Sequence, residues 1–134
     1  MLSILSAIFL LNGLFADEYL LSYEGKSKTT GSLCSVEVVK EADNSLYMEV
    51  RMNYGFAYAM DVEKAGDKYI ASIEADIAPN CDLVMGDSGK KYHYDIVVGP
   101  KAFQVTGKYC ERKCLPLGIS YPACEKIDET CIKD

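Results

Sequence analysis

The chain has 134 residues, enough for one domain with a modest core, and its 20 acidic and 14 basic side chains give a formal net charge of −6. Nucleic-acid binding needs a basic face, so this balance argues against DNA or RNA as a partner and favours a basic protein partner.

The first sixteen residues carry no charged side chain and hold an apolar run that ends at Leu14-Phe15-Ala16. This pattern predicts a signal peptide over residues 1–16, cleaved after Ala16, although no Lys or Arg precedes the run. The run is shorter than the roughly 20 apolar residues that span a bilayer, so we expect no membrane span in the mature chain. The expected location is therefore the periplasm or the outside of the cell.

Residues 17–109 show apolar side chains at every second position, the period of strands with one buried face. The rows expected to face inward are Tyr19-Leu21-Tyr23, Cys34-Val36-Val38, Leu46-Met48-Val50-Met52, Tyr58-Met60-Val62, Tyr69-Ala71-Ile73-Ala75-Ile77, Tyr92-Tyr94-Ile96-Val98 and Phe103-Val105-Tyr109. Turn residues separate the rows, including a tight turn at Gly99-Pro100, and no helical period lies between them. The sequence thus predicts an all-β antiparallel meander of about seven strands, with a small barrel preferred over a sandwich because the connections are short.

Residues 110–134 differ in composition and predict a cysteine-rich segment without strand alternation, packed on the same domain as a lid. A short helix is expected from Ala123 to Cys131. The even cysteine count in an exported chain predicts three disulfides, in any of fifteen pairings. Cys124 and Cys131 would lie too far apart on such a helix to bond each other, so Cys110 and Cys114 are the suggested partners. The six cysteines are Cys34, Cys81, Cys110, Cys114, Cys124 and Cys131.

Catalytic and metal chemistry find little support in these residues. His93 is the only histidine, and it is expected on the solvent face of a strand. No serine lies in a Gly-x-Ser-x-Gly elbow, and no two carboxylates stand out as a paired acid and base. Cys110-x3-Cys114 is not the usual zinc knuckle. We therefore expect no enzyme, no metal and no cofactor.

Two surface segments are candidate binding sites. The first is a predicted hairpin that carries aromatic residues, Tyr54, Phe56 and Tyr58, with Tyr47 in the preceding strand. Phe56 and Tyr58 are expected to close one end of the barrel; the alternative is a contact patch, because Tyr and Phe supply rigid area to interfaces.

The second segment is a predicted loop that comprises Ser88, Gly89, Lys90, Lys91 and Tyr92. Its Ser-Gly-x-x-Tyr pattern resembles the loop of periplasmic and membrane-bound inhibitors of c-type lysozyme, which are small exported β-barrels. The resemblance implies a loop that enters the lysozyme cleft, where Ser88 and a nearby lysine meet the catalytic carboxylates. The second motif of that family does not align: only Thr106 agrees within residues 102–108.

The sequence as a whole predicts an exported binding protein without catalytic activity. An inhibitor of c-type lysozyme is its most specific form. The alternatives are an envelope-associated structural or interaction protein that uses the aromatic hairpin, and a carrier that holds a small apolar ligand inside the barrel.

Overall fold

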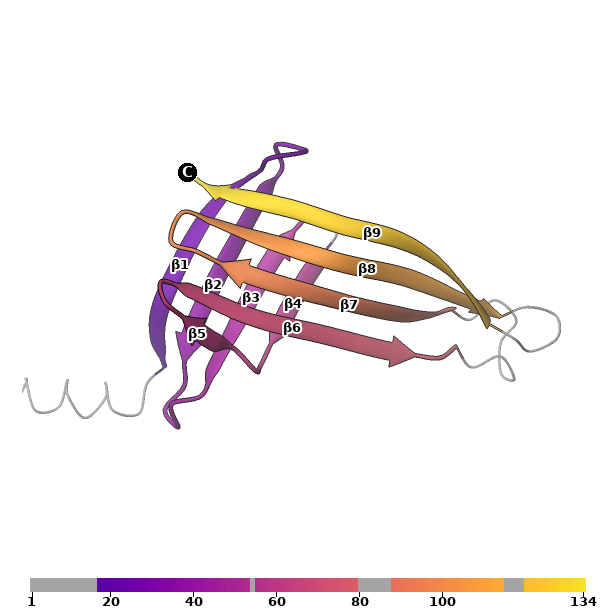
Figure 1. Ribbon diagram of the computed structural model, residues 1–134, viewed down its shortest axis with the longest axis horizontal. Helices are drawn as coiled ribbons and strands as arrows, with labels where there is room; N and C mark the ends of the chain where they lie inside the picture. The colour runs from indigo at the N-terminus through magenta and orange to yellow at the C-terminus, as the bar shows by residue number, and fades with distance from the viewer. Residues whose placement is uncertain (1–16, 54, 80–87, 115–119) are drawn as a thin grey trace, which may run out of the picture.

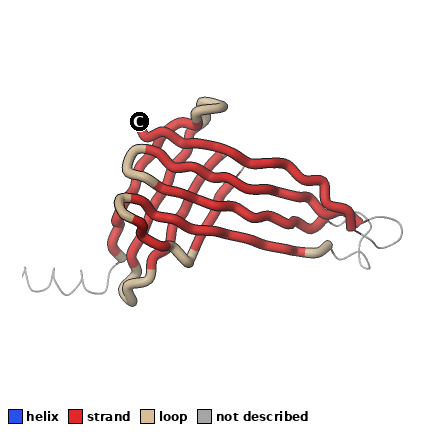
Figure 2. The backbone as a smooth tube through the Cα atoms, in the orientation of Figure 1, coloured by secondary structure: helices blue, strands red, loops and turns tan. Residues whose placement is uncertain are grey.

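The computed structural model describes residues 17–53, 55–79, 88–114 and 120–134, and these residues form nine strands. Figure 2 shows strands and connecting turns throughout the described chain. The strands are β1 (Glu18–Ser27), β2 (Leu33–Lys40), β3 (Leu46–Met52), β4 (Gly55–Ala59), β5 (Glu63–Ala65), β6 (Lys68–Ile77), β7 (Ser88–Val98), β8 (Ala102–Cys114) and β9 (Ser120–Lys133). The predicted signal peptide lies outside the described residues.

All nine strands belong to one antiparallel sheet in the order β4-β3-β2-β1-β9-β8-β7-β6-β5. Strands that follow each other in the chain are neighbours in the sheet, except for β4 and β5. The last strand, β9, also pairs with the first, β1, through three residue pairs that run from Gly25 with Lys133 to Ser27 with Cys131. The sheet curls into a half-barrel in which β1–β4 cross behind β6–β9 (Figure 1). The all-β antiparallel prediction is therefore confirmed. The strand number and the closure are corrected: the described residues form nine strands, and the sheet stays open between β4 and β5 because these two strands do not pair.

The core lies between the two crossing halves of the sheet. Its largest fully buried side chains include Met48 and Val50 from β3, Ile96 from β7 and Phe103 and Val105 from β8. These residues belong to the inward rows that the period of two predicted, since each row places its apolar side chains on one face of its strand. The rows of β3, β7 and β8 are thus confirmed in the core.

Strand β1 departs from strict alternation near its start. The register shifts between Tyr19 and Leu21, so an extra residue interrupts the pairing with β2. A bulge of this kind moves the residues before it to the opposite face. Tyr19 is therefore 65% exposed, although Leu21 and Tyr23 face the core as expected. Tyr19 pairs with Val39 of β2, and Val39 in turn pairs with Tyr47 of β3. Val39, between these two tyrosines, has no exposed surface.

The C-terminal segment is strand rather than lid or helix. β8 continues through Cys114, and β9 pairs with it from Cys114–Ser120 to Ala102–Ile132. The period of two is weak in β9 because its inner row alternates acidic and apolar residues, Glu125, Ile127, Glu129 and Cys131. The predicted helix is therefore wrong: pairing with a long neighbouring strand outweighs the local pattern.

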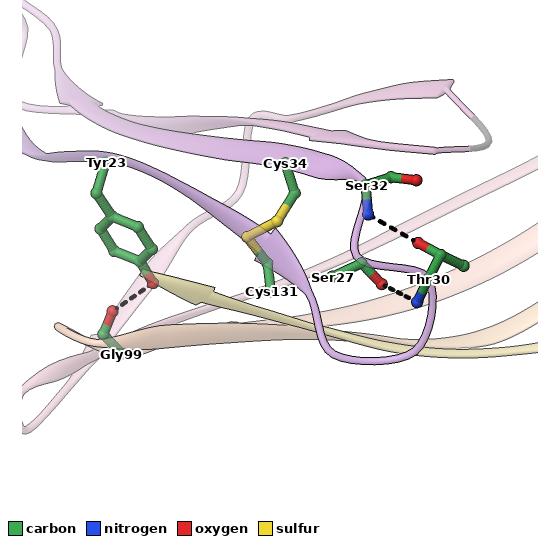
Figure 3. Close-up of a disulfide and its surroundings, with 7 residues drawn as sticks. All are labelled: Tyr23, Ser27, Thr30, Ser32, Cys34, Gly99 and Cys131. Atoms are coloured by element: carbon green, nitrogen blue, oxygen red, sulfur yellow. Dashed lines mark hydrogen bonds between the residues drawn. A yellow bond between two sulfur atoms is a disulfide. The ribbon is translucent and has the colours of Figure 1, made fainter. Parts of the chain in front are cut away.

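Two disulfides involve this segment. Cys34 of β2 bonds Cys131 of β9 across 97 residues of sequence, and both side chains are buried (Figure 3). Gly25 of β1 lies between these strands, where a β-carbon would collide with the Ile132 carbonyl. Tyr23, near this bridge in Figure 3, donates a hydrogen bond of 2.9 Å to the Gly99 carbonyl at the predicted Gly99-Pro100 turn.

The second disulfide joins Cys110 and Cys124, which face each other directly in β8 and β9. Of the two suggested partners, Cys110 therefore bonds Cys124, whereas Cys131 bonds Cys34 and not Cys114. Cys114 is disulfide-bonded as well, and Cys81 lies outside the described residues.

Candidate functional site

The strands β6 to β9 extend well beyond the four strands that cross behind them (Figure 1). On the inner face of this extension, three tyrosine rings form a row. Tyr92 stacks on Tyr94 with ring centroids 5.0 Å apart and on Tyr109 with centroids 6.4 Å apart, each at an angle of 18°. Tyr92 and Tyr94 are two residues apart on β7 and so share one face, and Tyr109 of β8 is the direct partner of Tyr92. Strand pairing therefore places all three rings on one face.

A cleft of about 580 Å³ opens over this row, and we call it the tyrosine cleft. One wall comes from the extension and the other from β3 and β4. Its lining residues are Val50, Met52, Gly55, Phe56, Ala57, Tyr58, Ile73, Lys90, Tyr92, Tyr94, Val105, Tyr109, Glu125 and Ile127. The lining is largely apolar and aromatic with few charged groups, as is common in sites for small ligands. The volume also lies within the range of such sites.

The charged groups of the cleft are Lys90 and Glu125. The Lys90 Nζ atom is 5.9 Å from the centre of the Tyr92 ring, and Glu125 and Lys90 are both exposed. Burial, and then the neighbouring Tyr109 and Tyr92, raise the pKa of the Tyr94 hydroxyl above its ordinary value. The tyrosine cleft can thus bind a ligand by stacking and hydrogen bonding.

One acidic side chain beside the cleft has an unmet hydrogen-bonding capacity. Glu129 pairs with the cleft residue Val105, and its Oε2 atom is buried with no hydrogen-bond partner among the described residues. A buried polar atom of this kind calls for a partner.

The five residues of the predicted inhibitory loop lie in strand β7. They pair with β8 from Ser88–Lys113 to Tyr92–Tyr109. Gly89 allows the chain after β6 to pass close by, because a β-carbon there would collide with the Ile77 carbonyl. The loop prediction is therefore wrong in conformation: the turn-like Gly-Asp-Ser-Gly composition concealed the start of a strand. Because side chains alternate along β7, Lys90 and Tyr92 line the tyrosine cleft, while Lys91 lies on the outer face.

The aromatic hairpin forms a second surface, on the outer face of β1, β3 and β4. Tyr47 and Tyr58 pack with ring centroids 5.2 Å apart, and Phe56 and Tyr58 are 56% and 40% exposed. The expectation that Phe56 and Tyr58 close the barrel end is wrong, because the register of β4 turns Ala57 and Ala59 inward instead. Tyr54 lies outside the described residues. We call Tyr19, Tyr47, Phe56 and Tyr58 the outer aromatic patch.

Carboxylates surround this outer aromatic patch. Partial burial raises the pKa of the Tyr47 and Tyr58 hydroxyls, and nearby Asp17 and Glu49 raise both further. Glu41 adds to the effect at Tyr58. A negative charge raises the pKa of a phenol because it disfavours a second negative charge nearby. The patch is thus both aromatic and acidic.

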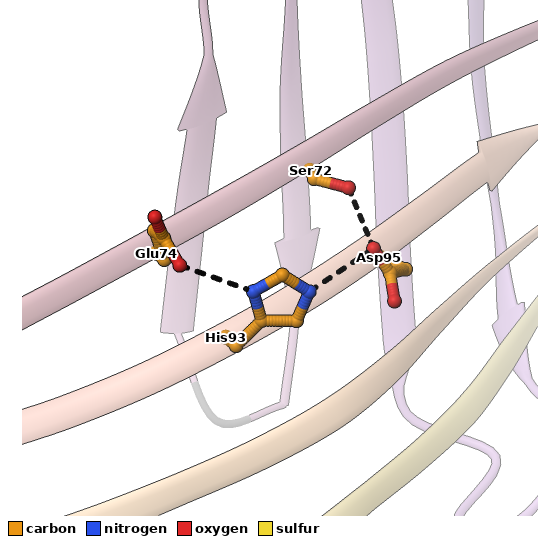
Figure 4. A network of polar contacts seen from close by, with 4 residues as sticks. All are labelled: Ser72, Glu74, His93 and Asp95. Atoms are coloured by element: carbon orange, nitrogen blue, oxygen red, sulfur yellow. Dashed lines mark hydrogen bonds and ion pairs between the residues drawn. The ribbon is translucent and has the colours of Figure 1, made fainter.

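His93 belongs to an exposed polar network with Ser72, Glu74 and Asp95 (Figure 4). Its Nε2 atom lies 3.3 Å from Asp95 and its Nδ1 atom 3.5 Å from Glu74, while the Ser72 hydroxyl donates to Asp95 at 2.6 Å. The Ser72 hydrogen bond, followed by His93, lowers the pKa of the Asp95 carboxyl. Since Ser72 bonds the carboxylate and not the imidazole, the arrangement activates no nucleophile. His93 also borders an outer hollow of about 690 Å³ with charged residues such as Lys91 and Lys108.

The sequence pattern assigned Tyr92, Tyr94 and Tyr109 to inward rows but did not group them as a site. The available signal was that Tyr92 begins one of these rows and Tyr109 ends the next one along the chain. Within the described ranges, no three His, Cys, Asp or Glu side chains could together hold a metal ion. The same residues include no helix with the length and apolarity needed to cross a membrane.

Comparison with known proteins found no matching protein-family model, no matching curated protein and no matching solved structure.

Proposed function

We propose that this protein is a non-catalytic binding protein and that the tyrosine cleft receives its ligand. The observation that carries the proposal is the stacked row of Tyr92, Tyr94 and Tyr109 in an open cleft of about 580 Å³. Tyr92 and Tyr109 stay partly exposed at the edge of the core while Tyr94 is buried, and an open, largely aromatic cleft of this kind favours an occupant. The two described disulfides are compatible with an oxidising, exported location.

The cleft combines aromatic rings with two charged groups. It extends from the β4 residues to the extension of β7, β8 and β9, which carries Lys90 and Glu125. A ligand with an apolar or aromatic body would stack on Tyr92, and its polar groups would meet Lys90 or Glu125. This arrangement favours the carrier function, with the cleft at the mouth of the half-barrel in place of a closed interior.

Binding of the neutral dye 1-N-phenylnaphthylamine tests the proposal. We expect a saturable rise in dye fluorescence with one site per chain. Tyr92→Ala should weaken binding about tenfold or more, because the central ring of the stack is lost. Tyr19→Ala is the matched control, since Tyr19 is an exposed tyrosine on the opposite face of the sheet. Equal dye affinity of the wild type and Tyr92→Ala, with both variants folded, would rule out the cleft.

Inhibition of c-type lysozyme is the second candidate, and the resemblance at Ser88 to Tyr92 motivates it. Lys90 supports it structurally, because its exposed ammonium group lies at the mouth of the cleft beside Tyr92. The net charge of −6 has the right sign for attraction to a basic enzyme.

A cell-wall turbidity assay with c-type lysozyme tests this candidate. Loss of one charge-assisted contact should cost about 2–4 kcal/mol, so Lys90→Ala should reduce inhibition on the order of 30-fold or more. Lys91→Ala should have little effect, because the adjacent lysine lies on the outer face. Wild-type protein that leaves the lytic rate unchanged at micromolar concentration would end this proposal.

A further inference from the structure

Strand β4 has a free edge that borders the tyrosine cleft. It pairs with β3 through five residues, Gly55 to Ala59, and forms no ladder on its other side among the described strands. Exposed edges usually carry charges or prolines that prevent further pairing. β5, at the other end of the sheet, carries Glu63 and Lys64, whereas β4 contains neither a charge nor a proline. The backbone of β4 is therefore available to another strand.

The inner face beside this edge would accept apolar side chains. Gly55 and Ala57 line the tyrosine cleft and are small, so they leave room between β4 and the opposite wall. That wall carries Ile73 and Tyr92. A strand laid along β4 projects every second side chain to this face.

The outer face beside the same edge would accept cations. Phe56 and Tyr58 are exposed there, and Glu49 is the direct cross-strand partner of Tyr58. Arg51 already lies over the Phe56 ring, with its guanidinium carbon 5.7 Å from the ring centre. This contact is an example, on the same face, of the attraction between a cation and an aromatic ring. The remaining side chains of an added strand would project to this aromatic and acidic surface.

We propose that β4 binds an extended peptide in which basic residues alternate with apolar ones. The peptide adds to the free edge as a further strand, its apolar side chains enter the tyrosine cleft and its basic side chains lie over Phe56 and Tyr58. This inference rests on the proposed function, because it assigns part of the cleft to the peptide. A second copy of the chain fits less well, because both copies carry a charge of −6 and carboxylates lie beside this edge.

Synthetic peptides provide the test of this inference. The probe is the capped peptide Lys-Val-Lys-Phe-Lys-Val-Lys, and the control replaces each lysine by glutamate. Isothermal titration calorimetry should show micromolar binding of the lysine peptide, at least tenfold tighter than binding of the glutamate peptide and weaker at high salt.

Backbone methylation distinguishes strand addition from simple charge attraction. Two further lysine peptides carry N-methyl groups on every second amide. One is methylated at the odd-numbered positions and the other at the even-numbered positions. Only one frame of amides faces β4 in an added strand, so one peptide should lose at least tenfold in affinity and the other should not. Equal affinities of the two methylated peptides would overturn the proposal.

Variants of the protein test whether the peptide binds beside β4. Tyr58→Ala should weaken binding about fivefold or more, while Ile132→Ala should not, because Ile132 is an exposed apolar residue four strands away from β4. If the dye binds in the cleft but the lysine peptide does not, the inference fails and the proposed function stands. Sedimentation that shows a dimer disrupted by Phe56→Lys would assign the edge to a second copy and would also overturn the inference.

Discussion

A Val50→Asp variant is expected to lose about 3–5 kcal/mol of free energy of unfolding, a large part of the stability of a domain of this size. Val50 is 1% exposed and lies on the inner row of β3 between the partners Val36 and Ala57. A carboxylate there would be almost fully buried, with apolar cross-strand partners and no paired cation on either neighbouring strand. Burial would raise its pKa, so the loss should shrink at low pH, where the carboxyl becomes neutral.

Chemical denaturation of two further variants controls this experiment. Glu49→Gln should change the free energy of unfolding by less than about 0.5 kcal/mol, because Glu49 is the neighbour of Val50 on the outer face. Ile73→Asp should fall between the two, since Ile73 lies in the open cleft and is only half-buried. Similar denaturation midpoints for Val50→Asp and Glu49→Gln would contradict the assignment of the two faces.

The second large effect is expected on removing the Cys34–Cys131 disulfide with the double variant Cys34→Ala and Cys131→Ala. The bridge closes a loop of 97 residues. By the chain-entropy estimate, a loop of about 100 residues stabilises the folded state by about 4.7 kcal/mol, and observed losses are about 2–5 kcal/mol. The effect should be large here because the ladder between β1 and β9 has only three residue pairs.

The matched control is the double variant Cys110→Ala and Cys124→Ala. Its loop spans 14 residues, for which the same estimate is about 3 kcal/mol, and ten or more residue pairs of the β8–β9 hairpin hold the same strands together. Urea unfolding under non-oxidising, metal-free conditions should therefore rank the Cys34–Cys131 variant as the less stable. The reverse order would show that the closure of the half-barrel does not depend on this bridge.

Local pattern predicted much of the fold because the period of two is a local property. The row from Leu46 to Met52 in β3 is correct, since each residue alternates without interruption. The pattern failed at Tyr19, where a bulge of one residue changes the face, and across β9, where Glu125 and Glu129 occupy inner positions. Neither a bulge nor an acidic inner row leaves a periodic signal.

For the candidate sites too, the sequence indicated some of the residues and only the structure revealed how they are arranged. The sequence offered Lys90 and Tyr92 as candidate binding residues but placed them in a loop, and it offered Tyr47, Phe56 and Tyr58 as a contact patch only as the alternative to closing the barrel end. It did not indicate that Tyr92, Tyr94 and Tyr109 would stack beside an open cleft. That outcome depends on how far β7 and β8 extend past the strands that cross behind them, which is a relation between distant segments.

The sequence by itself determined that this protein is an antiparallel all-β chain with disulfides, because alternation and cysteine content are properties of neighbouring residues and of composition. Only the tertiary structure decided which strands meet. The pairing of β9 with β1 and β8, the bond between Cys34 and Cys131 and the gap between β4 and β5 all join or separate residues far apart in the chain. These long-range pairings leave the tyrosine cleft open and the edge of β4 free, since a strand edge or an inner face is covered only where a partner strand reaches it.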